Sequence, residues 1–230
     1  MIKIENVDVY GFEAAIRGMR NPKNSWDKSD SHKCPCADWD GDCPMVMNDD
    51  EPVKDCDPDK YHFCVGKNDF KLMRTLANAG TDHGKFMRMI TVTLDITAPL
   101  YWWKEFDTYK VGTVANSCST MHKIHAKEFT LDDFSHEHLN DESTEYLSEL
   151  VDLLNRYRKL FLKDKNKSWW WQMIQLLPSS YNQRRTVMLN YAVLKNIYNS
   201  RKDHKLDCWV IFCNWIETLP YAKELICNVG

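Results

Sequence analysis

The segment ITVTLDITAPLYWWKEF, residues 90–106, predicts a strand followed directly by a helix. Apolar and polar residues alternate from Ile90 to Thr97, so one side of the extended chain is apolar and the other is polar. The dipeptide Ala98-Pro99 ends this strand, because proline has no backbone N–H to donate within a sheet. The aromatic residues after it predict a helix that packs against the same core.

Elements on either side of this segment extend the predicted core. Residues 2–9 alternate in the same way and predict a second strand, which ends at Gly11. Apolar residues at helical spacing then predict two helices, one directly after Gly11 and one from near Asp69 to Gly80. Residues 111–122, VGTVANSCSTMH, are small and polar and predict a loop that enters a turn or helix.

Three stripes of apolar residues in the C-terminal half predict three more helices. They span residues 146–161, 189–197 and 208–216. The dipeptide Leu177-Pro178 separates the first of them from the second, because proline interrupts a helix. The sequence contains no internal repeat and no low-complexity tract.

The composition is that of a compact chain of one or at most two domains. It has 230 residues, of which 43% are hydrophobic, and a formal net charge of −3. These values exclude a disordered chain, and no apolar stretch approaches the ~20 residues that a membrane span needs. The first residues do not resemble a signal peptide, so we expect a cytoplasmic protein with no membrane association.

The charge is unevenly distributed along the chain. Residues 27–59 hold eleven acids and three lysines, a balance of −8, so the rest of the chain, with the total at −3, carries +5. A mildly basic body suits an anionic small ligand such as a nucleotide, but it lacks the dense basic stripe of a duplex-binding protein. We interpret residues 22–66 as an acidic, cysteine-containing insertion in a single domain of residues 1–230.

The nine cysteines favour reduced thiols over a disulfide framework, because their number is odd and several lie in apolar helical patterns. The insertion concentrates seven potential zinc ligands, which are His32, Cys34, Cys36, Cys43, Cys56, His62 and Cys64. No pair has the C-x₂-C spacing of a zinc knuckle, so we expect a metal-free segment, with a structural zinc site as the alternative. Cys118, four residues before His122, is interpreted as a small residue in a turn rather than as a nucleophile.

Polar residues near the C-terminus have the composition of a ligand site. Asn190 and Asn196 are six residues apart on a predicted helix, and Arg201 and His204 follow them. Two carboxamides, a guanidinium and an imidazole can present donors and acceptors to a heteroaromatic ring and a cation to a phosphate. Helix capping and exposed polar positions are the alternative explanation.

Two regions, about 90 residues together, resemble the flavin-dependent thymidylate synthases, also called thymidylate synthase complementing proteins. The segment LMRTLANAGTDHGKFMRMITVTLDITAPLYWWKEFDTYKVGTVANSCST is similar, without gaps, to that family's helix, G-H-x-S/T segment, F-T-F strand, A-P turn and Q-x-x-R-H-R helix. Asn190, Asn196, Arg201 and the run that begins at Trp209 are similar to its N-x-R-x₃-N-x₄-R…W-x-I helix.

The resemblance implies an α+β fold with a twisted, largely antiparallel sheet and packed helices, assembled as a homo-oligomer, which is a tetramer in that family. It also implies a methyltransferase of thymidylate (dTMP) biosynthesis. Such an enzyme uses reduced FAD to carry a methylene group from methylenetetrahydrofolate to deoxyuridylate, and NADPH supplies the hydride. The cofactor carries the difficult chemistry, and the protein supplies orientation and charge.

The matched positions imply roles for individual residues. Arg201 is expected to contact and activate the nucleotide substrate, and Ser119 corresponds to the family's active-site serine. The residues expected around the flavin or the phosphates are His83, Lys110, Asn116, Asn190, Asn196 and His204. No metal ligand is implied.

The sequence differs from the family at functional positions. Residues 108–110, Thr-Tyr-Lys, replace its Arg-His-Arg motif, and Ala192 replaces the arginine between the two helix asparagines. A catalytically degenerate nucleotide-binding or scaffold protein of the same fold is therefore a second hypothesis. A third is an enzyme that alkylates a pyrimidine in a nucleic acid, with the tryptophans of residues 102–103 or 169–171 stacking a base, although a nucleic acid is not the partner we expect.

Overall fold

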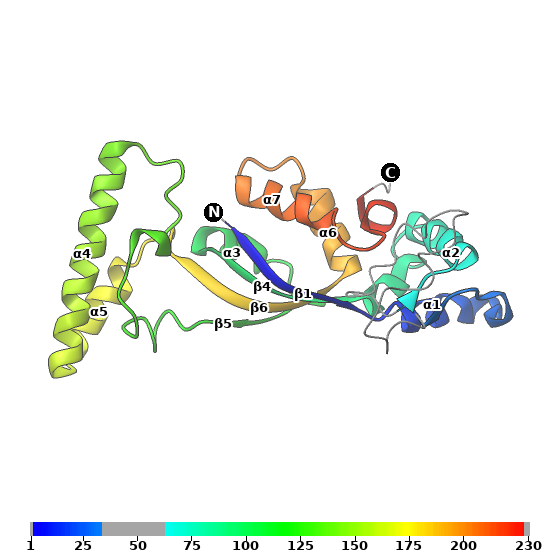
Figure 1. The fold of residues 1–230 in the computed structure, drawn as a ribbon, viewed down its shortest axis with the longest axis horizontal. Coiled ribbons are helices and arrows are strands. Elements are labelled where there is room, and N and C mark those ends of the chain that lie inside the picture. The colour runs from blue at the N-terminus through cyan, green and yellow to red at the C-terminus, as the bar shows by residue number, and fades with distance from the viewer. Residues whose placement is uncertain (1, 34–62, 228–230) are drawn as a thin grey trace, which may run out of the picture. The chain divides into compact units, whose positions relative to one another are not determined.

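The computed structural model describes residues 2–33 and 63–227 and has an α+β architecture. Four strands form one antiparallel sheet in the order β1-β4-β6-β5, and two short strands form a separate antiparallel pair, β2-β3 (Figure 1). The strands are β1 (Lys3–Tyr10), β2 (His32–Lys33), β3 (Phe63–Cys64), β4 (Thr91–Pro99), β5 (Val114–Ser117) and β6 (Asn182–Asn190). The prediction of an α+β fold with an antiparallel sheet is confirmed.

Seven α-helices, four short 3₁₀ helices and one π-helix complete the described part of the chain. The helices are α1 (Phe12–Arg20), α2 (Lys67–Asn78), α3 (Leu100–Phe106), α4 (Asp141–Asp164), α5 (Lys167–Leu176), α6 (Tyr191–Arg201) and α7 (Asp207–Ile216). The 3₁₀ helices are η1 (Asn21–Lys23), η2 (Trp26–Lys28), η5 (Gly84–Met89) and η6 (Leu131–Asp133), and the π-helix is η7 (Lys223–Cys227). Among the helices described, none combines the length and the apolar character needed to cross a bilayer.

Strand β4 has the alternation that its sequence predicts. Val92, Leu94 and Ile96 are buried, whereas the side chains between them are partly exposed. Leu100, the first residue of α3, donates its backbone N–H to the carbonyl of Tyr181 at 3.0 Å. This hydrogen bond fixes the start of α3 to the segment before β6. This arrangement confirms the strand and the aromatic helix predicted from residues 90–106.

Three elements differ from the sequence-based prediction. Residues 114–117 form strand β5 instead of a loop, and residues 182–190 form strand β6, so the predicted helix does not begin at Leu189 but at Tyr191. Helix α5 was not predicted as a separate helix. It begins anew after Lys165, which has a left-handed backbone conformation with φ 57, and Asn166 caps it by accepting from Ser168 N at 3.0 Å.

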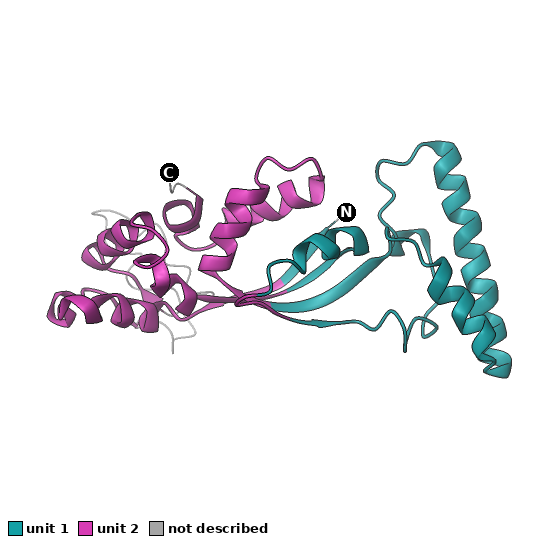
Figure 2. Ribbon diagram, turned by 180° about the vertical axis from the view of Figure 1, so that it is seen from behind, with its two compact units in different colours: residues 1–5, 95–110, 115–187 teal, residues 6–94, 111–114, 188–230 magenta. Residues whose placement is uncertain are grey.

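The chain divides into two compact units, shown in teal and magenta in Figure 2. Unit 1 comprises residues 1–5, 95–110 and 115–187, and unit 2 comprises residues 6–94, 111–114 and 188–230. In unit 1, Trp102 and Trp103 are 0% and 1% exposed, so the hypothesis that they stack a nucleobase is wrong. The organisation as one domain with an insertion stays a prediction.

A buried ion pair connects α1 and α2 in unit 2. Arg20 Nε lies 2.5 Å from Asp69 Oδ1, and the two side chains are 4% and 0% exposed. The Arg20 guanidinium also donates to the backbone carbonyls of Ser25 and Lys28, each at 2.9 Å. All three nitrogens of the Arg20 guanidinium therefore donate hydrogen bonds inside the protein, as a buried charge requires.

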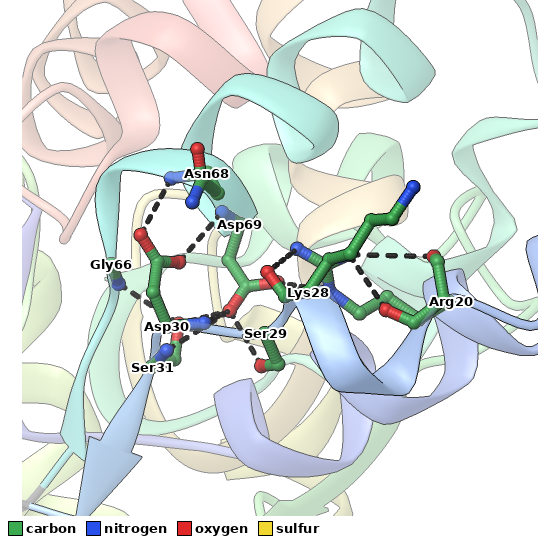
Figure 3. A network of polar contacts seen from close by, with 9 residues as sticks. Arg20, Lys28, Ser29, Asp30, Ser31, Gly66, Asn68 and Asp69 are labelled. Atoms are coloured by element: carbon green, nitrogen blue, oxygen red, sulfur yellow. Dashed lines mark hydrogen bonds and ion pairs between the residues drawn. The ribbon is translucent and has the colours of Figure 1, made fainter.

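The same carboxylate holds the beginning of the predicted insertion (Figure 3). Asp69 Oδ2 accepts from the hydroxyls of Ser29 and Ser31, both at 2.7 Å. The Asp30 carboxylate in turn accepts from Asn68 N at 2.8 Å and from Asp69 N at 3.1 Å, which satisfies free donors at the start of α2. Residues 29–31 are therefore fixed to α2, immediately before the β2-β3 pair.

The predicted zinc ligands fall mostly beyond this anchored region. Cys34, Cys36, Cys43, Cys56 and His62 lie outside the described residues. Within residues 2–33 and 63–227, no three metal-ligating side chains form a cluster. The metal-free segment stays a prediction.

Candidate functional site

Helix α6 places two of the predicted site residues at its opposite ends. Asn190 is the residue before the helix, and its carboxamide oxygen accepts from Val193 N at 3.1 Å. Tyr191 N donates to the carbonyl of Ile90 at 3.0 Å, which ties the start of the helix to β4. Arg201 is the last helical residue, about 16 Å along the axis from Asn190 at the usual rise per residue. The capping role offered as the alternative for Asn190 is therefore present.

A glycine allows the chain before β5 to approach this cap. Gly112 has a φ of +81, and a Cβ built on it would lie 2.8 Å from Asn190 Nδ2 and 3.3 Å from Val193 Cγ2. Any larger residue would be strained in its backbone and would also collide with the carboxamide. Residues 111–114 consequently approach the N-terminus of α6 closely, as the small residues of this segment predict.

The other end of α6 forms a compact cluster around a buried indole. Trp209 of α7 is 0% exposed, and the Arg201 guanidinium carbon lies 4.8 Å from the centre of its ring. His204 meets the same ring at 6.3 Å between centroids, and its Nδ1 accepts from Leu206 N at 3.1 Å. Arg201 and His204, both predicted site residues, are therefore brought together, and the indole holds the guanidinium in one place.

A hollow in unit 2 contains a third predicted residue. It has a volume of about 480 Å³ and is formed by α2, the turn before η5, η5 itself and α6; we call it the α6 hollow. The residues that line it are Ala77, Asn78, Gly80, Thr81, Gly84, Met87, Arg88, Ala192, Lys195, Asn196 and Asn199. Two of these residues are cationic, three are carboxamides and none is acidic.

Lys195 is the most constrained cation of the α6 hollow. Its Nζ donates to the carbonyl of Ala77 at 2.7 Å, and burial lowers the pKa of its ammonium below that of a free lysine. Arg88 is exposed on η5. His83 is exposed directly before η5, next to Gly84, so it lies beside the hollow without lining it. The hollow thus offers two cations and several amide donors to an anionic ligand.

Ser119 lies in a different hollow, within unit 1. This hollow has a volume of about 550 Å³, and its hydroxyl-bearing rim includes Ser119 and Thr120. The Ser119 hydroxyl accepts from His122 N at 2.8 Å and from Met121 N at 3.3 Å, which fixes it in a turn. Two cations of this hollow pair with carboxylates, Lys127 with Asp133 and Arg184 with Asp95. Its electrostatics are therefore mixed, unlike those of the α6 hollow.

The remaining predicted residues of unit 1 are exposed. Asn116 lies on β5, all four of whose residues are exposed. Lys110 is exposed beyond α3, in a turn in which the Thr108 hydroxyl donates to the carbonyl of Glu105 at 2.7 Å. Lys110, Asn116 and Ser119 belong to unit 1, and the other five predicted residues belong to unit 2. One site that combines all eight stays a prediction.

Four of the cationic and carboxamide residues of the α6 hollow were not predicted from the sequence: Asn78, Arg88, Lys195 and Asn199. A signal for two of them was present, because Ala192, Lys195, Asn196 and Asn199 have the i, i+3, i+4, i+7 spacing of one helical face. Arg88 has no such signal, since it reaches the hollow only through the packing of η5 against α6.

Comparisons with known proteins identify the fold. No protein-family model matches the chain, and neither does any curated protein. The solved structure of the flavin-dependent thymidylate synthase ThyX from Helicobacter pylori, complexed with FAD and dUMP, matches with a TM-score of 0.62 and 14% identity over 97% of this chain and 99% of that one. A second structure of ThyX from Helicobacter pylori, with FAD and dUMP, gives a TM-score of 0.64 and 14% identity over 99% and 98%. The chain therefore has the fold of these flavin-dependent thymidylate synthases along nearly its whole length.

Proposed function

We propose that this chain binds a flavin nucleotide and a pyrimidine nucleotide, and that it is a transferase of the flavin-dependent thymidylate synthase type. Its acceptor would be deoxyuridylate or a related pyrimidine, with methylenetetrahydrofolate and NADPH as co-substrates. The shared fold and the FAD and dUMP named for both structural neighbours support the class of ligand. The α6 hollow is the observation that carries the proposal, because its lining includes two cations and three carboxamides and no carboxylate.

The residues present in the α6 hollow fit the phosphate-bearing part of FAD. Arg88 and Lys195 supply positive charge, and Asn196 and Asn199 supply amide donors and acceptors. Apolar side chains such as Met87 provide a surface against which a flat ring can pack. We therefore assign these residues to the cofactor, with His83 beside them.

When bound, reduced flavin would relay the one-carbon unit to the pyrimidine. The role of this protein would be to bind the flavin and the pyrimidine nucleotide and to orient them. The Arg201 guanidinium is a planar cation with several donors and contacts Trp209, so it suits a nucleotide phosphate or a uracil carbonyl. Ser119, Lys110, Asn116 and Asn190 would have the roles that the resemblance implies. A homotetramer belongs to the same proposal.

Removing the cations of the α6 hollow tests the cofactor assignment. We expect Lys195→Met and Arg88→Met each to weaken FAD binding about ten- to a hundredfold, because each loses a charge-assisted contact. Affinity should also fall with rising pH before ordinary lysines titrate, because the lowered pKa of Lys195 removes its charge early. Quenching of flavin fluorescence during titration measures both effects.

Lys85→Met is the matched control for these variants. Lys85 is exposed on η5, the 3₁₀ helix that also carries Arg88, but it does not line the hollow. Lys85→Met changes the net charge by the same amount as the other two substitutions. It therefore shows whether FAD affinity depends on a contact inside the hollow or on the overall positive charge of the protein. Equal losses of affinity in all three variants would contradict the assignment.

Arg201→Ala should affect nucleotide binding more than stability. We expect a loss of about 1 kcal/mol in the free energy of unfolding, from the contact with Trp209, and a ten- to a hundredfold loss of affinity for deoxyuridylate. Calorimetric titration and thermal melts of both proteins measure these effects. Arg201→Lys keeps the charge without the planar fork and should be intermediate. Unchanged affinity with a collapsed melting temperature would show a purely structural role.

A binding protein without catalysis is the second candidate function. It is favoured by the turn after α3, where Thr108 and Tyr109 replace two of the family's side chains and the Thr108 hydroxyl bonds to the backbone. Two measurements separate the candidates. Flavin absorbance of the purified protein tests binding, and chromatography of deoxyuridylate incubated with FAD, methylenetetrahydrofolate and NADPH tests turnover. Binding without product would favour the second candidate.

A further inference from the structure

The second half of α4 and the whole of α5 are strongly basic. Residues 153–176 contain six lysines and arginines and one acid, so they carry +5, and the rest of the chain, with the total at −3, carries −8. The acid is Asp164, whose carboxylate is already engaged, because it accepts from Asn166 N at 2.8 Å and from Trp169 Nε1 at 3.1 Å. The positive charge of this segment is therefore local, and the net charge of the whole chain does not reveal it.

Cations from three segments of unit 1 gather around one histidine. Arg158 Nε donates to the carbonyl of His125 at 3.0 Å, which fixes the segment that carries His125 to α4. The His125 ring lies 4.8 Å from that of Phe161 between centroids, and Lys165 Nζ lies 5.6 Å from the centre of the Phe161 ring. The pKa of the His125 imidazole is lowered by burial and then by three nearby charges, those of Lys165, Lys123 and Arg158. These three cations thus converge on one face of unit 1.

Exposed aromatic rings continue this face at the start of α5. Trp170 Nε1 donates to the carbonyl of Met121 at 2.8 Å, so its ring is held against the segment that carries Lys123. Trp171 is 44% exposed, and its ring lies 4.7 Å from that of Trp170 between centroids. Lys167 Nζ lies 5.9 Å and 5.7 Å from the centres of these two rings. We call this surface the basic face, and it consists of Lys123, Arg158, Lys165, Lys167, Trp170 and Trp171.

Two lysines of the basic face are not the residues that helix stability favours. Lys165 follows α4 in a left-handed backbone conformation with φ 57, a position that favours glycine or asparagine. Lys167 is the first residue of α5, where the helix dipole favours an acidic side chain, and the first turn of α5 contains no acid. Binding of an anion accounts for a cation at both positions.

We propose that the basic face binds single-stranded nucleic acid, with its cations near the phosphates and a base stacked against Trp171. Proteins bind single strands through positively charged surfaces that also present aromatic side chains, on which the bases stack. An exposed indole that lies beside a lysine meets both requirements. Since every base has a flat face, this recognition tolerates different sequences. The inference concerns unit 1 alone and does not rest on the proposed enzymatic function.

Other polyanions fit the basic face less well. The bases of a duplex are paired and stacked on one another, so they cannot stack on an indole unless the duplex opens. An acidic peptide would use the positive charge but not the exposed ring. An anionic bilayer needs apolar side chains that can insert, whereas much of the apolar side of α5 is already used, because Trp170, Met173 and Ile174 pack in the core of unit 1.

Fluorescence anisotropy of labelled oligonucleotides tests the proposal on the full chain. The probes are single-stranded oligothymidylate and oligouridylate of about twelve nucleotides, within the usual site size of such proteins, and a duplex of the same length. Deoxyuridylate is present in excess, so that a strand cannot bind through the proposed nucleotide site. We expect at least one single strand to bind more tightly than the duplex, and its affinity to fall as the salt concentration rises.

Substitutions separate the contribution of the charges from that of the ring. Lys123→Gln, Lys167→Gln and Lys165→Asn each remove one cation, and asparagine suits the left-handed backbone at residue 165. We expect each to weaken binding about three- to tenfold and to reduce the slope of log affinity against log salt by about 0.7. Trp171→Ala should weaken binding about five- to a hundredfold with an unchanged slope, because stacking releases no counterion.

Lys104→Gln and Tyr146→Ala are the matched controls. Lys104 is exposed on α3, in unit 1 but outside the basic face, so its substitution changes the net charge by the same amount. Tyr146 is 68% exposed in the acidic first half of α4, so its substitution removes an exposed ring elsewhere on the same unit. Both variants should bind like the wild type. Thermal melts identify any variant that has lost its fold.

Four results would overturn the proposal. The first is a wild-type protein that binds neither single strand at about 100 mM salt, and the second is equal binding of single strands and duplex. The third is an equal loss of affinity in Lys104→Gln and in the three lysine variants of the basic face, or an unchanged affinity of Trp171→Ala. The fourth is binding to vesicles of phosphatidylcholine and phosphatidylglycerol, or to polyglutamate, without binding to either strand, which would identify a membrane or peptide surface instead.

Discussion

Asp69→Asn is expected to lower the free energy of unfolding by about 3–5 kcal/mol, because it leaves the buried Arg20 without a counter-charge. The substitution keeps the size and shape of the side chain, so little of the effect can come from packing. The hydroxyls of Ser29 and Ser31, which donate to the carboxylate at 2.7 Å, would also meet a weaker acceptor. The loss is therefore mainly electrostatic.

The pH dependence of stability gives a second measure of the same carboxylate. Burial by itself raises the pKa of Asp69, but hydrogen bonds from Ser31, Ser29 and Arg20 and the charge of Arg20 outweigh burial, so its pKa is lowered. A carboxyl whose pKa is lowered on folding stabilises the protein above its unfolded pKa of about 3.9. This stabilisation should be lost as the pH falls through the folded pKa, and Asp69→Asn should lack that part of the acid dependence.

Chemical denaturation at neutral and acidic pH measures both effects. Glu13→Gln is the matched control, because Glu13 accepts from Arg17 at 3.1 Å on the same helix as Arg20 but in an exposed pair. An exposed pair at this spacing contributes about 0.3–0.5 kcal/mol, so this variant should change stability very little. Similar effects of the two substitutions would mean that burial does not strengthen the Arg20–Asp69 pair.

Trp103→Ala should destabilise unit 1 by about 3–5 kcal/mol, the cost typical of removing a large buried aromatic side chain. Trp103 is 1% exposed, and its Nε1 donates to the carbonyl of Gln183 at 2.9 Å. The Arg185 guanidinium carbon lies 4.1 Å from the ring centre, and Arg185 also pairs with Asp107 at 2.7 Å. One substitution therefore removes packing, a hydrogen bond and a cation–π contact together.

Trp171→Ala is the comparison variant for this prediction. Trp171 is 44% exposed on α5 and contacts Lys167 of the same helix at 5.7 Å, so its removal should cost at most about 1 kcal/mol. Denaturant titrations followed by circular dichroism give both values. A loss of less than about 1 kcal/mol for Trp103→Ala would contradict the position of its ring in the core.

The sequence predicts those strands and helices in which buried residues recur at regular spacing. β4 is one of these, because Val92, Leu94 and Ile96 are buried in strict alternation. β6 escaped prediction because a polar residue, Gln183, occupies a buried position. Its carboxamide is satisfied by the carbonyl of Cys118 at 2.7 Å, so burial costs little there. β5 has no buried residue at all, and it is a strand only through its pairing with β6.

The candidate site was harder to predict than the fold. Asn190 and Arg201 follow from the resemblance. The structure shows that Asn190 caps α6, whereas Asn196 lies on the helical face that lines the α6 hollow, so the two asparagines have different surroundings. The α6 hollow depends on contacts between η5 and α6, segments about 100 residues apart. Such long-range packing leaves no local period in the sequence, so Arg88 could not have been assigned to the hollow in advance.

The anchoring of residues 29–31 has a consequence for the integrity of the chain. Lys33 and Phe63 are partners in the β2-β3 ladder, and antiparallel partners have Cα atoms about 4.5–5.5 Å apart, so the last described residue before the gap and the first one after it lie side by side. Apart from the covalent chain, the Arg20–Asp69 ion pair and the hydrogen bonds of residues 29–31 join residues 2–33 to α2. A polypeptide cut between these strands would give two fragments that each carry one half of a buried ion pair, Arg20 on the first and Asp69 on the second. The two fragments would therefore carry complementary buried charges on either side of the cut.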